Sequence, residues 1–145
     1  MKLPKSVRNR FREYGREGGR ARASCMSAES RKAVASAAAI RRWIQVRFGA
    51  HGFHELGLPG GEVIDHGLAD LARNEESVES LLVSLAAPRL RREGVPLPRT
   101  VFPDADARLY RLLERKNEDL AHERYVAYLR QAESFADACA AARTA

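Results

Sequence analysis

The chain has 145 residues, a usual length for one domain, and its 45% apolar and 30% charged residues are typical of a folded protein rather than a disordered one. No stretch approaches the roughly 18 consecutive apolar residues that a membrane-spanning helix needs, and the N-terminus lacks the apolar run of a signal sequence. We therefore expect a cytoplasmic protein with one small hydrophobic core and no membrane partner.

The charge is distributed unevenly along the chain. The formal net charge is +6, but residues 1–50 hold 13 Lys and Arg against 3 Asp and Glu, whereas residues 51–145 hold 12 against 16. A basic segment attracts polyanions by releasing their counterions, and an acidic one gains nothing from this effect. The sequence thus predicts a basic head that binds a polyanion and an acidic body suited to protein contact.

Residues 1–27 are rich in glycine and arginine. Residues 5–14 could form a short helix, but Gly15, Gly18 and Gly19 follow, and each costs about 1 kcal/mol relative to alanine inside a helix. We expect these glycines to interrupt the helix and to leave residues 1–27 as a mobile basic arm.

Residues 28–49 are expected to form a basic amphipathic helix. Ser27 is a suitable N-cap and Gly49 a suitable left-handed residue after the last turn. Ile40 and Ile44 lie on the apolar stripe, and Trp43 lies on a flank with cationic residues.

Residues 50–145 are expected to form an acidic helical body. A glycine-rich loop opens it, Pro88 should kink a helix or start a new one, and residues 95–103 form an extended connector with three prolines. The apolar spacing predicts an all-α fold with about five helices around one core. Four of these helices lie in the body, at residues 62–73, 77–86, 104–117 and 118–142.

The segment GREGGRARASCMSAESRKAVASAAAIRRW, residues 15–43, contains the strongest local pattern. It resembles a basic segment of bacterial small proteins in which a GRxGGxARA sequence precedes a capped alanine-rich helix. Glycines let a backbone approach a phosphate closely, and arginines supply fork-shaped donors to it. A solvated basic linker is the alternative. Nucleic acid, DNA or RNA, is the expected partner, and the candidate contacts are Arg16, Gly18, Gly19, Arg20, Arg22, Arg31, Arg42, Trp43 and Arg47.

Residues 53–135 carry a second resemblance, in FHELGLPGGEVIDHGLADL, SVESLLVSLAAPRLRREGVPLP and HERYVAYLRQAESF. They look like small proteins encoded next to nucleotidyltransferase-type toxins of the abortive-infection class. The resemblance implies an antitoxin that neutralises its toxin by contact. The alternative is a nucleic-acid-binding accessory protein of a mobile or defence element, without a toxin. Candidate partner-binding residues are Arg89, Arg91 and Arg92.

Catalytic and metal-binding patterns are not found in the sequence. Cys25 and Cys139 lie far apart, and the histidines are not accompanied by a cysteine pair with ligand spacing. Paired carboxylates such as Asp104 and Asp106 stand at expected helix starts, where capping explains them. We expect no metal, no cofactor, no catalytic residue and hence no enzyme.

Overall fold

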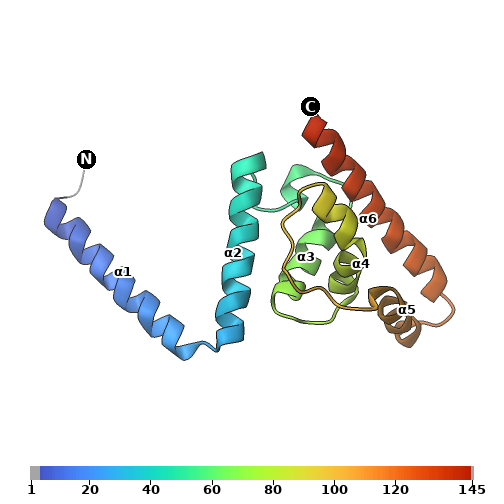
Figure 1. The fold of residues 1–145 in the computed structure, drawn as a ribbon, viewed down its shortest axis with the longest axis horizontal. Helices are drawn as coiled ribbons and strands as arrows, with labels where there is room; N and C mark the ends of the chain where they lie inside the picture. The colour runs from blue at the N-terminus through green and yellow to red at the C-terminus, as the bar shows by residue number, and fades with distance from the viewer. Residues whose placement is uncertain (1–3, 145) are drawn as a thin grey trace. The chain divides into compact units, whose positions relative to one another are not determined.

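The structure is a computed structural model that describes residues 4–144 of the chain (Figure 1). The described residues form helices and connecting turns, with no strand, so the expected all-α class is confirmed. No described helix is both long and apolar enough to cross a membrane. The elements in chain order are α1 (Lys5–Cys25), α2 (Ala28–Phe48), a short 3-10 turn (His54–Leu56), α3 (Gly61–Ala72), α4 (Val78–Arg92), α5 (Ala105–Lys116) and α6 (Ala121–Thr144).

The chain divides into two compact units, Met1–Lys32 and Ala33–Ala145. The first unit consists mainly of α1, which has no buried residue. The second unit holds the rest of α2 and all later elements, including every buried apolar side chain of the part described. The acidic body predicted from the sequence therefore lies within the unit that has the hydrophobic core.

The prediction that glycines interrupt the basic arm is wrong, and it also made the helix count one too low. Lys5–Cys25 form one continuous helix, which raises the number of described helices from the expected five to six. Gly15, Gly18 and Gly19 lie inside it without a positive φ. A helical glycine lowers the stability of a helix but breaks no backbone hydrogen bond, and the intervening Arg, Glu and Ala residues favour helix.

The boundaries predicted for α2 are confirmed. The Ser27 hydroxyl accepts a hydrogen bond from the Ser30 N–H at 3.1 Å, which caps the first turn. Gly49 follows the last turn with φ +71°, and its N–H donates to the Gln45 carbonyl at 2.9 Å. A left-handed residue is easiest for glycine because it has no Cβ.

Helices α3 and α4 pack closely at one point of their interface. Ser77 caps α4 and shares a reciprocal pair of hydrogen bonds with Ser80. Where the helices cross, a Cβ added to Gly67 of α3 would lie 2.3 Å from the Glu79 carbonyl oxygen and 2.6 Å from Cγ2 of Val83. Only glycine fits at this crossing without a shift of the backbone.

We expect Gly67→Ala to destabilise the second unit by about 1–3 kcal/mol, because the added methyl group overpacks a backbone contact. Urea denaturation followed by circular dichroism measures the change. Gly15→Ala is the matched control, since its Cβ would meet nothing within 4 Å. If the two variants unfold at the same urea concentration, the close crossing is not a constraint of the fold.

The last three helices differ in detail from the expectation. α4 continues through Pro88 to Arg92, since Ala87 and Leu90 on either side of the proline are buried and hold the helix in place. α6 begins at Ala121 rather than residue 118.

Asp106 does not cap α5. Its carboxylate accepts a hydrogen bond from the hydroxyl of Tyr125 on α6, and this bond together with burial raises the pKa of Tyr125 to about 12.

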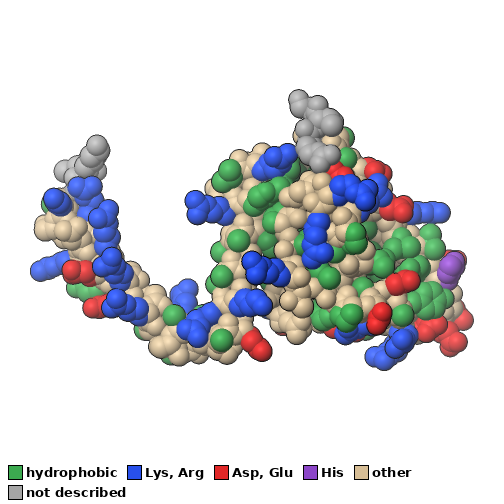
Figure 2. Space-filling view, viewed as in Figure 1, with side chains coloured by type: hydrophobic (Ala, Val, Ile, Leu, Met, Phe, Trp, Pro, Cys, Tyr) green, Lys and Arg blue, Asp and Glu red, His purple; other side chains and the backbone are tan. Residues whose placement is uncertain are grey.

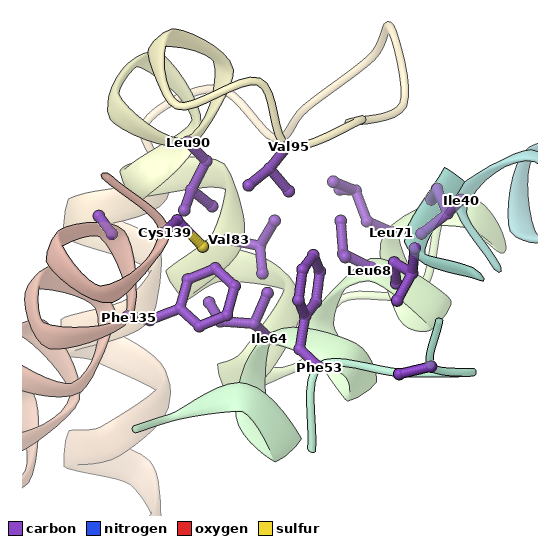
Figure 3. Packing of buried hydrophobic residues seen from close by; sticks show 13 residues of the cluster. Ile40, Phe53, Ile64, Leu68, Leu71, Val83, Leu90, Val95, Phe135 and Cys139 are labelled. Atoms are coloured by element: carbon purple, nitrogen blue, oxygen red, sulfur yellow. The ribbon is translucent and has the colours of Figure 1, made fainter. Parts of the chain in front are cut away.

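The buried side chains form two clusters that are joined by shared neighbours. The first is centred on Phe53 and Phe135, whose rings meet edge to face with centroids 4.9 Å apart (Figure 3). The second lies between α4, α5 and α6 around Leu81 and Leu109. Ala86 and Phe102 are partly buried and pack against both clusters, so one continuous apolar interior results.

Candidate functional site

Helix α1 carries a stripe of arginines on one side. Arg8, Arg12, Arg16 and Arg20 follow one another at intervals of four residues, and at 3.6 residues per turn these positions stay on one side of a helix. With a rise of 1.5 Å per residue the stripe is about 18 Å long. Lys and Arg side chains follow the helix along its length (Figure 2).

The charges of this stripe are not neutralised within the described chain. The ion pairs of residues 4–142 all lie in the second unit, and none involves a residue of α1. All four arginine side chains are exposed. The first unit therefore presents its positive charge to solvent, as a polyanion-binding surface requires.

The other candidate contacts in the N-terminal part lie around this stripe. Arg22 follows Gly15 and Gly19 at intervals of seven and three residues, which puts these three residues side by side on α1. Gly18 borders them, three residues after Gly15 and four before Arg22. Arg31, at the start of α2, is exposed and forms no ion pair with a described residue. The same holds for Arg42.

Trp43 is part of the apolar packing of the second unit. Its ring is half-buried and lies 5.5 Å from the ring of Phe48 and 6.5 Å from that of Phe53, measured between centroids. The Arg47 guanidinium lies 5.9 Å from the Trp43 centroid and 5.7 Å from that of Phe48. These cation–π contacts and the packing explain both residues without a ligand.

The three arginines expected to bind a protein partner have contacts inside the chain. Arg89 of α4 forms an ion pair with Asp137 of α6 at 2.5 Å. The Arg91 guanidinium donates to the Pro98 carbonyl at 3.5 Å, and Arg92 is also engaged within the chain. Arg89 thus links α4 to α6, and Arg91 links α4 to the proline-rich connector.

The second unit also has a cleft of about 500 Å³ beside α2 and α3, lined by apolar and polar side chains. One Asp65 carboxylate oxygen accepts the backbone N–H of Phe53 at 3.0 Å. The other accepts the N–H of His54 at 3.0 Å and faces its Nδ1 at 2.8 Å. Gly52 has no room for a side chain, since a Cβ would lie 2.7 Å from Asp65 Oδ2. Asp65 thus fastens the loop before α3 to the helix.

The cleft does not gather the ligands of a metal site. His51, His54 and His66 all line it, with Glu62 and Asp65. Within residues 4–142, however, no three His, Cys, Asp or Glu side chains converge closely enough to hold an ion. Asp65 is already engaged with the loop, so the geometry supports a structural role for the His54–Asp65 pair.

Asp65 changes the ionisation of His54. The hydrogen bond that the His54 imidazole donates to the Asp65 carboxylate raises the pKa of His54 above 6.5, and the negative charges of Asp65, Glu55 and Glu62 add to this effect. The contribution of protonated His54 to the stability of the fold is therefore fully present below about pH 6.5, and it is lost as the pH rises through the raised pKa.

We expect Asp65→Asn to return the pKa of His54 towards 6.5, measured by an NMR titration of the imidazole protons. Glu62→Gln is the control and should lower it less; an unchanged pKa in Asp65→Asn would refute the pairing.

Sequence reasoning missed several residues that belong to these features. Arg8 and Arg12 extend the stripe of Arg16 and Arg20, and their regular spacing of four residues was a signal that could have identified them. Arg41, which lines the cleft, and Asp65 had no such signal, because their roles depend on contacts made by the folded loop.

No family model matches the chain, and neither a curated protein nor a solved structure matches it.

Proposed function

We propose that the chain is a nucleic-acid-binding regulator whose helix α1 contacts phosphates and whose helical body contacts a protein. The observation that carries this proposal is the stripe formed by Arg8, Arg12, Arg16 and Arg20, which is exposed and has no ion pair among the described residues. Neutralising a phosphate with each arginine releases counterions and supplies affinity that does not depend on sequence.

The protein partner follows from the acidic balance of residues 51–145. The resemblance of residues 53–135 favours a nucleotidyltransferase-type toxin as this partner, which would make the chain an antitoxin. The binding of α1 to nucleic acid does not depend on this assignment. A helix with exposed positive charge binds a polyanion whether or not the body holds a toxin.

Capture of the tagged full chain from its native cells at about 50 mM salt tests both parts of the proposal. We expect bound nucleic acid that nuclease removes, and a protein that stays bound after nuclease treatment. Absence of nuclease-sensitive material would contradict the role of α1. A retained protein without nucleotidyltransferase character would contradict the antitoxin assignment alone.

A further inference from the structure

The cleft beside α2 and α3 has the dimensions of a small-molecule site. Its volume of about 500 Å³ lies within the range of about 300–1,000 Å³ that is typical of such sites. Its lining residues, from Ala37 to Ala69, all belong to the second unit, so the cleft is formed within this unit alone. Neither the fold nor the proposed function makes use of this volume.

Helix α2 supplies an apolar surface and one cation to the cleft. Ala37, Ile40, Arg41 and Ile44 all line it, and their spacing of three, one and three residues puts them on one face of the helix. The Arg41 side chain is exposed and forms no ion pair with a described residue. A guanidinium of this kind can bind a carboxylate through two parallel hydrogen bonds.

Helix α3 supplies the opposite charge. Glu62, Asp65, His66 and Ala69 line the cleft with the same spacing of three, one and three residues. Both carboxylate oxygens of Asp65 already accept hydrogen bonds from the loop before α3. Glu62 is exposed and forms no ion pair with a described residue, so its carboxylate is the one available to a ligand.

The cleft thus holds a cation and a carboxylate that come from different helices and are not paired with each other. It also has apolar side chains from both helices, among them Ile40 and Leu68 (Figure 3). An anion in the cleft would be attracted by Arg41 but repelled by Glu62, and a cation would meet the reverse. A zwitterion places an opposite charge at both positions and is complementary to the whole cleft.

We propose that this cleft binds a small zwitterion with an apolar side chain, of the chemical class of free α-amino acids. The ligand carboxylate binds the Arg41 guanidinium, and the ligand ammonium group binds the Glu62 carboxylate. The ligand side chain lies against the apolar residues of α2 and α3. This inference goes beyond the proposed function and does not depend on the arginines of α1.

An NMR titration of the full chain with L-leucine tests the proposal, with the imidazole signals as reporters. His51, His54 and His66 line the cleft, whereas His122 lies on α6 outside it. A ligand of this size binds with a dissociation constant on the order of 1 mM. We expect saturable shifts of the first three imidazole signals, and none of the His122 signal, up to about 20 mM leucine at a constant pH of about 6.5, where α-amino groups are protonated.

Two analogues and two variants identify the contacts of each end of the ligand. Leucinamide lacks the carboxylate and isocaproate lacks the ammonium group, and each should bind the parent about fivefold more weakly than leucine. Arg41→Gln should abolish the preference for leucine over leucinamide, and Glu62→Gln the preference over isocaproate. Arg42→Gln is the control and should bind as the parent does, because Arg42 is exposed at the next position of α2 and does not line this cleft.

Several outcomes would overturn the proposal. Shifts that do not saturate, or shifts of the His122 signal equal to those of the other three, would show that leucine does not bind in the cleft. Isocaproate binding as tightly as leucine would indicate an anion site, and leucinamide binding as tightly would indicate a cation site. Each of these results contradicts the zwitterion and leaves the binding of α1 to nucleic acid untouched.

Discussion

Replacing Arg12, Arg16 and Arg20 together by alanine should strongly weaken the salt dependence of duplex binding. Each phosphate contact contributes about −0.9 to the slope of log affinity against log salt concentration, so the variant should have a slope shallower by about 2.7. Over a fourfold rise in salt the parent would then lose roughly 40-fold more affinity than the variant. Anisotropy titrations at several salt concentrations give both slopes.

The control for this variant removes the same charge from the second unit. Arg111, Arg115 and Arg130 are exposed and form no ion pair with a described residue, so their replacement by alanine changes the net charge of the chain equally. We expect a slope close to that of the parent. Equal slopes in the two triple variants would show that net charge attracts the nucleic acid and that the stripe of α1 has no special part in it.

Phe135→Ala should cause the largest loss of stability of any single substitution considered. The side chain is fully buried and packs edge to face on Phe53, so its removal takes away apolar contacts and leaves a cavity at the junction of α6 with the loop before α3. Such truncations cost about 3–5 kcal/mol, a large part of the stability of a small domain. Urea denaturation of the full chain measures the loss.

Phe11→Ala makes the same chemical change at an exposed position. Phe11 is 65% exposed on α1, and we expect its replacement to change the free energy of unfolding by less than about 0.5 kcal/mol. A Phe135→Ala variant that unfolds at the same urea concentration as Phe11→Ala would contradict the central position of Phe135 in the core.

The sequence predicted the helix boundaries that depend on local chemistry. Ser27 was expected to cap a helix, and its hydroxyl accepts the N–H of the residue three positions later; Ser77 caps α4 in the same way. Gly49 was also expected to adopt a left-handed conformation, because a residue without a Cβ can do so easily and thereby end a helix. Such signals act over one turn and need no knowledge of the fold.

Features that depend on tertiary contacts were not predicted. Pro88 stays inside α4 because buried neighbours hold the helix on both sides. The spacing of apolar residues does not show whether this burial outweighs the hydrogen bond that a proline removes. Asp65 binds a loop 11 and 12 residues before it, a contact that requires the turn at Gly52. The helix over residues 5–25 was missed because the cost of its glycines was overestimated relative to the other residues.

Only the positive charge of the candidate interface was predicted from the sequence. The excess of arginine near the N-terminus is visible in the composition, but the stripe on α1 depends on the helix being continuous through Gly15 and Gly19. Trp43 was expected to contact nucleic acid because it stands among arginines, and the packing of its ring on Phe48 and Phe53 was not predicted. The burial of an aromatic residue at the edge of a helical stripe depends on its neighbours in space.

The salt dependence of duplex DNA binding by the full chain is the measurement that tests the central claim most directly. Five of the six arginines of α1, at positions 8, 12, 16, 20 and 22, lie on one side of the helix and can contact phosphates together, which predicts a slope of about −4.5 for log affinity against log salt concentration. A slope between about −3 and −5 agrees with binding along the helix. A slope near zero, or no binding at about 50 mM salt, would contradict the claim that the exposed arginines of α1 bind nucleic acid.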